Sequence, residues 1–395
     1  MHVSEVIELL RNAKRPLFHV GQGVRIAGAI DDFMGFVEAH GIPFVTARNA
    51  NDICASDHPL CIGRPGTFAQ RGANFAVQTC DLYIAIGTRL TLTQTGYNSK
   101  DYARNAVIVQ VDIDAAELGK GTLREPIRIR MDAKSFIQAL LGVSGFNHWD
   151  AWLKRCQRLR DKYPVCLPEY KDQKNYVNSF YFIDVLSDLA THEDTIVTDM
   201  GFAFQNTHQA WKVKKGQRLI TNCGLAPMGW GLPAAIGAVF ATGRRVICIT
   251  GEGGLMMNIQ ELATLSHHRL PIKIFVLNNG GYLTIKQTQQ LGFEGRLMGV
   301  NKDSGLSFPN LHGIAQAFGI GNDWCSGNDY VQNIIKRTLA APGPVLCELM
   351  MNPDQPQAPR SINRRNPDGT MNPTQLEDAF PFLDPAEVAE NMRIQ

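Results

Sequence analysis

Two stretches of the sequence share one pattern, and that pattern decides the fold. Residues 246–254 read VICITGEGG, and residues 272–282 read IKIFVLNNGGY. Each begins with a short apolar run rich in β-branched residues, which is typical of a buried parallel strand, and each ends in a glycine-rich turn. The 27 residues that separate Glu252 from Asn279 suffice for one strand–helix–strand crossover. We therefore expect two strands to end together at one edge of a sheet.

The same alternation runs through most of the chain. Longer segments with helical periodicity separate the apolar runs, as at residues 30–40, 133–141 and 258–266. The pattern predicts an α/β fold with two doubly wound domains, each built on a parallel sheet. The runs that we expect to be buried strands are residues 16–20, 81–86, 106–112, 195–198, 246–250, 272–277 and 345–350.

Two breaks in the alternation predict the domain boundaries. Residues 148–174 are dense in Lys, Arg, Asp, Trp and Tyr, which is typical of a helical linker between domains. After Met351 the chain is rich in Pro, Asn and Arg and loses its apolar period. We expect a first domain over residues 1–146, a linker over 147–176, a second domain over 177–351 and a tail over 352–395.

The composition excludes several classes of function. The chain has 395 residues, of which 44% are hydrophobic and 19% charged, an ordinary globular balance. Lys and Arg together number 39 and Asp and Glu 37, without a charged block, which argues against binding to nucleic acid or to a membrane surface. No apolar run reaches the ~18 residues of a membrane span.

The cysteine pattern and the first residues indicate a cytoplasmic protein. Nine cysteines are scattered along the chain without a C-x-x-C pair. This argues against a disulfide framework and a zinc site and favours a reducing compartment. Residues 1–5 lack the charged and apolar segments with which a signal peptide begins.

The two strand ends carry the chemistry that the sequence indicates most strongly. A carboxylate at Glu252 and a side-chain amide at Asn279, brought together, suit a hard cation such as Mg²⁺. Gly253 and Gly254 expose backbone amides at the start of the next helix, where a diphosphate would bind. The alternative is two glycine-rich turns and a surface glutamate.

Two features of the first domain stay open on the residues alone. The loop at 21–28, GQGVRIAG, follows the first strand and could approach a phosphate, or it could form a tight strand-to-helix turn. Asp112 and Asp114 end a predicted strand. They could hold a ribose or a metal, or cap the next helix.

At these motifs the sequence resembles the thiamine diphosphate (ThDP) enzymes, in particular the acetolactate synthase and pyruvate oxidase branch. The family's G-D-G and N-N motifs stand here as GEG at 251–253 and NN at 278–279. Its approach motif stands as GLAPMGWGLPAAIG at 224–237. Residues of about 12–145 resemble the family's central domain, through AIGTR at 85–89 and VDID at 111–114, and about 177–351 its diphosphate-binding domain.

The resemblance implies a set of site residues. The metal ligands would be Glu252, Asn279 and the backbone carbonyl of Gly281. Met228 would lie under the thiazolium ring, and the carbonyl of Ala226 would accept a hydrogen bond from the aminopyrimidine. The remaining cofactor contacts would be Gly201, Gly251, Gly253, Gly254 and Tyr282.

The resemblance also implies an activity for which this chain is incomplete. It would be the Mg²⁺–ThDP-binding component of an acetolactate synthase-like transferase or lyase that decarboxylates and ligates a 2-oxo acid, as a homodimer or homotetramer. The family's N-terminal pyrimidine-binding domain has no counterpart here, so the catalytic glutamate would come from that domain in cis or in trans. We therefore expect no catalytic residue in this chain and no activity from it alone. The alternative is a non-catalytic homologue with a binding or regulatory role.

Several positions depart from the family pattern. Glu252 replaces an aspartate, Ala226 replaces a glycine, and Phe202 and Ala203 stand where polar diphosphate contacts are found. FAD is open in the central domain: Arg89 matches a family arginine, but residues 90–93 lack the acidic pair that follows it in FAD-bearing members. In the tail, arginines could meet an anionic substrate or be solvated, namely Arg360, Arg364 and Arg365.

Overall fold

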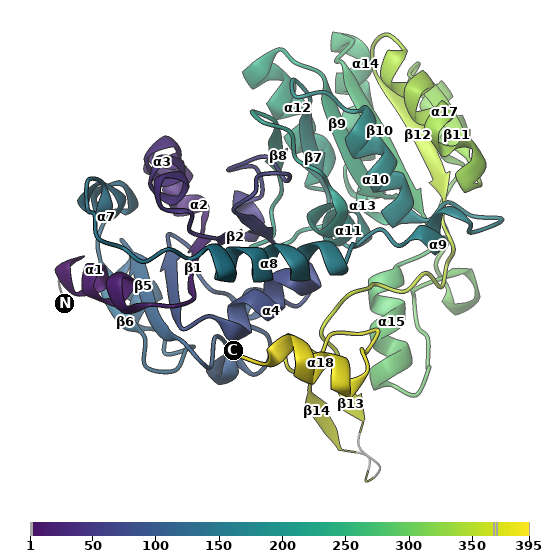
Figure 1. The fold of residues 1–395 in the computed structure, drawn as a ribbon. Helices are drawn as coiled ribbons and strands as arrows, with labels where there is room; N and C mark the ends of the chain where they lie inside the picture. The colour runs from purple at the N-terminus through teal and green to yellow at the C-terminus, as the bar shows by residue number, and fades with distance from the viewer. Residues whose placement is uncertain (1–2, 366–367, 369, 395) are drawn as a thin grey trace. The chain divides into compact units, whose positions relative to one another are not determined.

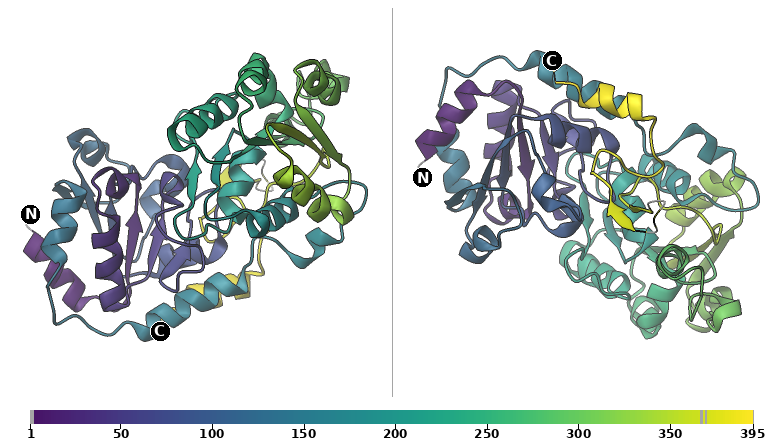
Figure 2. Two further views of the ribbon diagram at one scale, coloured as in Figure 1. Left: turned by 90° about the horizontal axis from the view of Figure 1, so that it is seen from above. Right: turned by 90° about the horizontal axis from the view of Figure 1, so that it is seen from below.

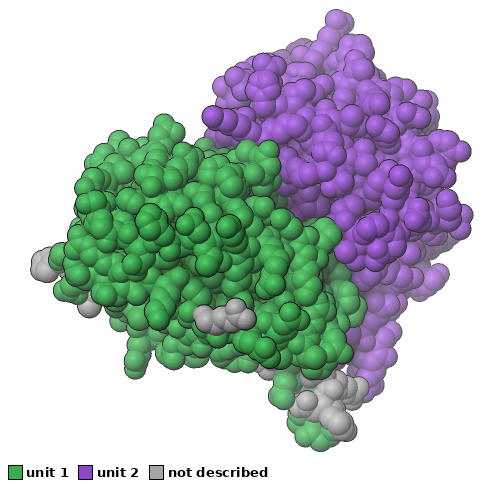
Figure 3. Space-filling model, viewed as in Figure 1, with its two compact units in different colours: residues 1–165, 358–395 green, residues 166–357 purple. Residues whose placement is uncertain are grey.

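The computed structural model describes residues 3–365, 368 and 370–394, and the chain divides into two compact units (Figure 3). Unit 1 comprises Met1–Val165 and Ala358–Gln395, and unit 2 comprises Cys166–Gln357. Unit 1 is therefore discontinuous in sequence, because the last part of the chain returns to it.

Unit 1 is built on a six-stranded parallel sheet in the order β3-β2-β1-β4-β5-β6 (Figure 1). Its central pair is β1 and β4, in which His19 lies beside Ala85. The order reverses direction between these two strands, which makes the sheet doubly wound. The strands are β1 (Pro16–Val20), β2 (Phe44–Thr46), β3 (Cys61–Gly63), β4 (Leu82–Ile86), β5 (Val107–Asp112) and β6 (Ile127–Arg130).

Helices cover both faces of this sheet (Figure 2). On one face α1 (Val3–Asn12), α2 (Gln22–Ile26), α3 (Ile30–His40) and α7 (Ala133–Leu140) pack together, and on the other α4 (Arg71–Thr79) packs between α8 (Asp150–Lys162) and α18 (Pro385–Met392). The shorter elements are η1 (Arg48–Ala50), α5 (Leu92–Thr95), η2 (Ser99–Asp101), α6 (Ala115–Gly119) and the hairpin of β13 (Asn363–Arg365) and β14 (Met371–Pro373).

The predicted linker contains α8, and this helix packs within unit 1. The indole of Trp152 donates to the Pro16 carbonyl over 2.8 Å. A Cβ atom at Gly72 would come within 2.6 Å of the Arg160 amide, so α4 and α8 touch through their backbones. The tail is fixed to the same unit, because Asn74 Nδ2 donates to the Leu376 carbonyl over 2.8 Å.

Unit 2 is built on a second six-stranded parallel sheet, in the order β11-β12-β10-β9-β7-β8. Adjacent strands are in register through pairs such as Leu277 with Gly251 and Thr198 with Ile249. The order reverses between β7 and β9. The strands are β7 (Thr195–Thr198), β8 (Arg218–Ile220), β9 (Val246–Gly251), β10 (Ile272–Asn278), β11 (Gly321–Cys325) and β12 (Val345–Met350).

The helices of unit 2 also form two layers. Buried side chains of α12 (Gly231–Thr242), α14 (Leu262–His268) and α16 (Leu311–Ala317) share one apolar core with the sheet. On the other face α10 (Ser179–Leu189) packs against α17 (Asn328–Ala340) and α11 (Phe202–Ala210), and the Phe182 and Phe275 rings lie 5.3 Å apart. The remaining elements are α9 (Pro168–Lys171), α13 (Glu252–Met257), η3 (Ile259–Glu261), α15 (Leu283–Gly292) and η4 (Lys302–Ser304).

The predicted fold class, two doubly wound parallel-sheet domains, is confirmed. Each of the seven predicted runs forms a strand. The helix expected over 258–266 is instead η3 followed by α14. Among the described residues, no helix combines the length and the apolarity that crossing a membrane requires.

The structure also describes the open features of the first domain. A Cβ atom at Gly21 would come within 2.1 Å of the Gly87 carbonyl oxygen, so the glycine lets two loops pack tightly. Asp114 caps α6 by accepting from the Ala116 amide over 2.8 Å. Both geometries are those of the structural alternatives, a tight turn and a helix cap.

Candidate functional site

The predicted site residues gather where the central strands of unit 2 end. β10, β9 and β7 are neighbours in the sheet, and the strand order reverses between β9 and β7. In a doubly wound sheet, the crevice outside the carboxyl ends at such a reversal is the usual place for a ligand. Asp199 follows β7, Glu252 follows β9 and Asn279 follows β10.

Glu252 is the most unusual group of this cluster. Its side chain is fully buried, and Oε1 accepts from the amides of Gly281 over 2.8 Å and Asn279 over 3.2 Å. Its other carboxylate oxygen, Oε2, is buried and has no hydrogen-bond partner in the described part of the chain. Burial raises the pKa of Glu252 to about 7, although backbone amides partly stabilise its charge. Such an oxygen suits a cation or a proton.

The turn after β10 is held close to Glu252. Tyr282 donates its amide to the Val300 carbonyl over 2.8 Å, and Gly281 forms a bridge with Asn301. A Cβ atom at Gly281 would approach the Val300 oxygen to 2.0 Å, so this position needs a glycine. The turn thus brings the Gly281 and Asn279 amides to Glu252.

The donor types at this turn fit a hard cation. Among the described residues, no group of three or more His, Cys, Asp or Glu side chains is placed to bind a metal. A cation held by the Glu252 carboxylate, the Asn279 amide oxygen and the Gly281 carbonyl would therefore have oxygen ligands only. Mg²⁺ prefers such ligands and takes others from water or from phosphate groups.

Gly253 and Gly254 form a tightly enclosed turn at the start of α13. A Cβ atom at Gly253 would lie 2.3 Å from Cε1 of Tyr282 and 3.2 Å from the methyl of Met228. A Cβ atom at Gly254 would lie 2.4 Å from Oδ2 of Asp199. The structure therefore brings Tyr282 and Met228 together with the glycine turn that follows Gly251.

The two other predicted residues lie on neighbouring loops. Gly201 precedes α11 with φ 67°, and a Cβ atom there would lie 3.5 Å from Oγ1 of Thr284 on α15. Ala226 shares the loop of Met228 and has φ 55°, a left-handed conformation that costs an alanine about 1–2 kcal/mol. The backbone of Ala226 is therefore strained.

Asp199 lies against the glycine turn and is not among the residues predicted from the sequence. Its carboxylate is buried and accepts from the Met200 amide over 2.8 Å and from the Thr250 hydroxyl over 3.0 Å. Burial raises the pKa of Asp199, and these donors oppose the rise. The sequence does show an acidic residue directly after a predicted strand. Its contact with Thr250, however, depends on the pairing of β7 with β9, which the sequence does not show.

The tail arginines belong to unit 1, whereas this cluster belongs to unit 2. Arg360 belongs to unit 1, where its backbone pairs with Phe68 and Phe380. The side chains of Arg364 and Arg365 lie outside the described part of the structure. Their expected contact with an anionic substrate stays a prediction.

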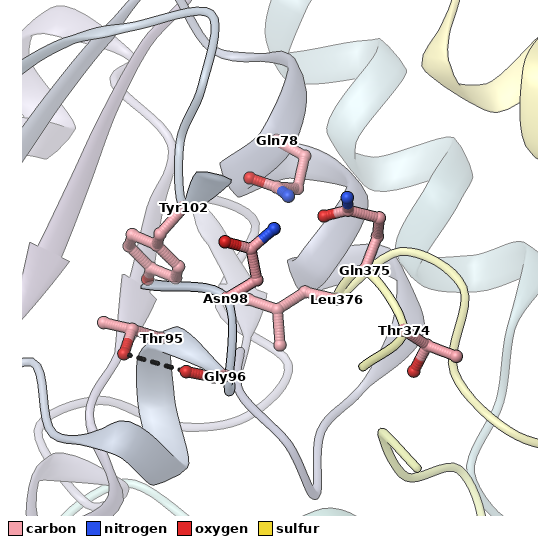
Figure 4. Close-up of a pocket in the computed structure, with 8 residues that line it drawn as sticks. All are labelled: Gln78, Thr95, Gly96, Asn98, Tyr102, Thr374, Gln375 and Leu376. Carbon is pink, nitrogen blue, oxygen red and sulfur yellow. Dashed lines mark hydrogen bonds between the residues drawn. The ribbon is translucent and has the colours of Figure 1, made fainter. Parts of the chain in front are cut away.

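Unit 1 has a small hollow of its own (Figure 4). Amide and hydroxyl side chains such as Gln78, Asn98 and Gln375 line it. Gln78 already donates to Glu377 and accepts from the Ala103 amide. This hollow offers no charged group to a ligand.

Comparison with known proteins gives matches over both units. Residues 3–140 match the family model described as "Thiamine pyrophosphate enzyme, central domain", and residues 199–349 match "Thiamine pyrophosphate enzyme, C-terminal TPP binding domain". All the predicted site residues lie in the second match.

Three curated relatives illustrate the similarity. The acetolactate synthase large subunit of Porphyra purpurea is 32% identical over 87% of this chain and 58% of its own length. Acetolactate synthase isozyme 2 large subunit of Escherichia coli is 31% identical over 89% and 62%. Acetolactate synthase 2, chloroplastic, of Zea mays is 31% identical over 88% and 55%. The chain thus spans about three fifths of the length of the relatives it matches.

Proposed function

This chain belongs to the thiamine pyrophosphate enzymes, with their central and C-terminal domains, and we propose that it is the Mg²⁺–ThDP-binding component of an acetolactate synthase-like enzyme that acts on a 2-oxo acid. The observation that carries the proposal is the buried Oε2 atom of Glu252, which has no hydrogen-bond partner among the described residues and lies beside a glycine turn. An orphaned carboxylate oxygen is costly unless a cation neutralises it. The residues present therefore fit a metal-bound diphosphate.

Each site residue receives a role in this proposal. Glu252, the side-chain oxygen of Asn279 and the carbonyl of Gly281 would hold Mg²⁺. Close approach of the diphosphate needs positions without side chains, and glycines stand at 201, 251, 253 and 254. Tyr282 would flank the cofactor from the turn after β10.

Met228 and Ala226 would orient the rest of the cofactor. The Met228 methyl lies near Gly253, so its side chain would support the thiazolium ring, and the Ala226 carbonyl would accept from the aminopyrimidine. When bound, ThDP supplies the carbon nucleophile for decarboxylation and ligation of 2-oxo acids, and the protein supplies binding and orientation.

The proposal includes a second protein surface over the site. Three large apolar side chains, on the 221–230 loop and at or after the end of α15, are exposed to solvent: Leu225 by 91%, Met298 by 81% and Leu291 by 60%. Exposed apolar groups of this kind are typical of an interface. We assign this surface to a pyrimidine-binding domain, in cis or in trans, which would supply the catalytic glutamate within a homodimer or homotetramer.

The binding proposal is tested by titrating ThDP into the purified chain with and without Mg²⁺. Wild-type chain is expected to bind ThDP only with the metal, and a Glu252→Ala/Asn279→Ala double variant is expected to lose that binding. Glu193→Ala is the control, because Glu193 is an exposed acid of the same unit. Equal binding by the double variant would refute the site assignment.

The alternative is a non-catalytic homologue with a binding or regulatory role, and the strained Ala226 backbone favours it. An experiment that combines the chain with a separately expressed pyrimidine-binding domain distinguishes the enzyme from the non-catalytic homologue. Pyruvate consumption with Mg²⁺ and ThDP supports the enzyme. Binding of the domain and the cofactor without turnover supports the alternative.

A further inference from the structure

One residue of the loop at 221–230, Gly229, is held through both of its backbone polar groups. The Gly229 amide donates to both carboxylate oxygens of Asp199, each over 3.1 Å. The Gly229 carbonyl accepts from Nδ2 of Asn258 over 2.8 Å. Asp199 directly follows β7 and Asn258 directly follows α13, so two separate elements meet on one residue of the loop.

The packing around this part of the loop admits only glycine at positions 229 and 231. A Cβ atom at Gly229 would come within 2.5 Å of the Met257 Cβ, and one at Gly231 within 2.8 Å of the Asp199 Cβ. Gly229 also has φ 84°, which glycine adopts without strain. Because Gly229 and Gly231 pack so closely, their backbone is fixed relative to β7 and α13.

The preceding part of the same loop is far less enclosed. Leu225 is 91% exposed and Met228 41% exposed, and the Ala226 amide donates to the Asn222 carbonyl within the loop itself. Met228 nevertheless lies beside the glycine turn, at 3.2 Å from the position of a Cβ atom on Gly253. Since Gly229 follows Met228 directly, the bonds to its amide and its carbonyl restrain the backbone next to that side chain.

We propose that Asp199 and Asn258 are positioning residues that grip the backbone of Gly229 from its amide and its carbonyl and thereby hold Met228 beside Gly253. The value of this grip to catalysis rests on the proposed function, in which Met228 supports the thiazolium and Ala226 accepts from the aminopyrimidine. The grip itself is a property of this chain without cofactor. Its loss would leave the metal-binding turns in place and free the loop that orients the cofactor.

Hydrogen–deuterium exchange of the cofactor-free chain tests the grip. Asn258→Ala removes the donor to Gly229, and Asp199→Asn replaces one acceptor oxygen by an amide. Each is expected to speed exchange across residues 222–231 by about tenfold, because each lost bond favours local opening. Gln260→Ala is the control, since Gln260 is exposed and bonds Oδ1 of Asn258 without touching the loop.

Unchanged hydrogen exchange over residues 222–231 in Asn258→Ala would refute the proposal. Asn258→Ala is the milder substitution, so it still gives this test if Asp199→Asn does not fold. A second readout separates positioning from general support. With Mg²⁺, ThDP and a pyrimidine-binding domain, Asn258→Ala is expected to lower kcat about tenfold while the Kd for ThDP stays within about threefold. If kcat and the affinity for ThDP fall by the same factor, Asn258 has only a structural role. If wild-type chain binds no ThDP, the proposed function fails, whereas the exchange result still decides the grip.

Discussion

The amide of Gly281 donates to Oε1 of Glu252 over 2.8 Å, and this bond joins the turn after β10 to the first residue of α13. The same oxygen accepts from the Asn279 amide. Oε1 therefore bonds backbone amides, whereas Oε2 has no partner among the described residues and is the atom that we propose as a metal ligand. The carboxylate organises the two turns and supplies the proposed ligand at the same time.

Glu252→Gln is expected to separate these two tasks. The amide oxygen can still accept from Gly281, but the side chain no longer carries the charge that holds Mg²⁺. Loss of one charged ligand, about 2–3 kcal/mol, should weaken Mg²⁺-dependent ThDP binding about 100-fold. Calorimetric titration measures it. The melting temperature of the metal-free variant should not fall, because an uncompensated buried charge is removed; a large decrease would contradict this account.

Gly254→Ala is expected to destabilise unit 2 by about 1–3 kcal/mol, because the new methyl would lie 2.4 Å from Oδ2 of Asp199. Gly237→Ala is the matched control. Gly237 lies within α12 with no atom near its missing Cβ, so alanine there should stabilise by about 0.5–1 kcal/mol. Urea denaturation measures the unfolding free energy of both variants. Changes of the same sign in the two variants would refute the prediction.

Ala226→Gly is expected to raise the unfolding free energy by about 0.5–1 kcal/mol. The left-handed backbone at φ 55° costs alanine about 1–2 kcal/mol, and the greater freedom of glycine in the unfolded chain offsets part of the gain. Ala234→Gly, within α12, should instead lose about 1 kcal/mol. Denaturation midpoints measure both changes. A loss of stability in Ala226→Gly would show that its methyl packs favourably.

His19 is expected to make unit 1 sensitive to acid. It is buried, and burial lowers its pKa to about 3; its ring contacts the Tyr83 hydroxyl, which lies 2.8 Å from the Tyr102 hydroxyl. Between pH 6.5 and 3 the unfolded chain binds a proton at this position that the folded chain does not, so stability falls as the pH falls.

The expected loss from His19 is about 2 kcal/mol between pH 6.5 and 5. The His19→Gln variant has no titrating side chain at this position. Its unfolding free energy should therefore fall by about 2 kcal/mol less than that of the wild type over the same pH range. Urea denaturation of both proteins at several pH values measures the difference. Parallel curves for the two proteins would mean that His19 does not cause the acid sensitivity.

The long buried strands could be predicted because they carry their own signal. Residues 16–20, 195–198 and 345–350 form β1, β7 and β12 with the predicted bounds. Three-residue strands such as Phe44–Thr46 and Arg218–Ile220 escaped prediction because so few residues show no period. Their pairing is fixed by the neighbouring strand and not by their own composition.

The candidate site was predictable only where one local motif carries it. Glu252 and Asn279 stand out because a single crossover separates them, which sequence spacing can show. The bond between the Thr250 hydroxyl and Asp199 joins positions 51 residues apart, and it requires that β7 and β9 be neighbours. The orphaned Oε2 atom was likewise beyond prediction, because it depends on which oxygen the backbone amides take.

The return of residues 358–394 to unit 1 bears on how the protein is made. The segment supplies α18 and the Leu376 carbonyl that Asn74 binds, whereas unit 2 is continuous from Cys166 to Gln357. During synthesis the ribosome therefore delivers all of unit 2 before it delivers the last pieces of unit 1. Since domains fold as units while the chain emerges, the later half of the sequence can reach its native state first, and the earlier half waits for the closing segment.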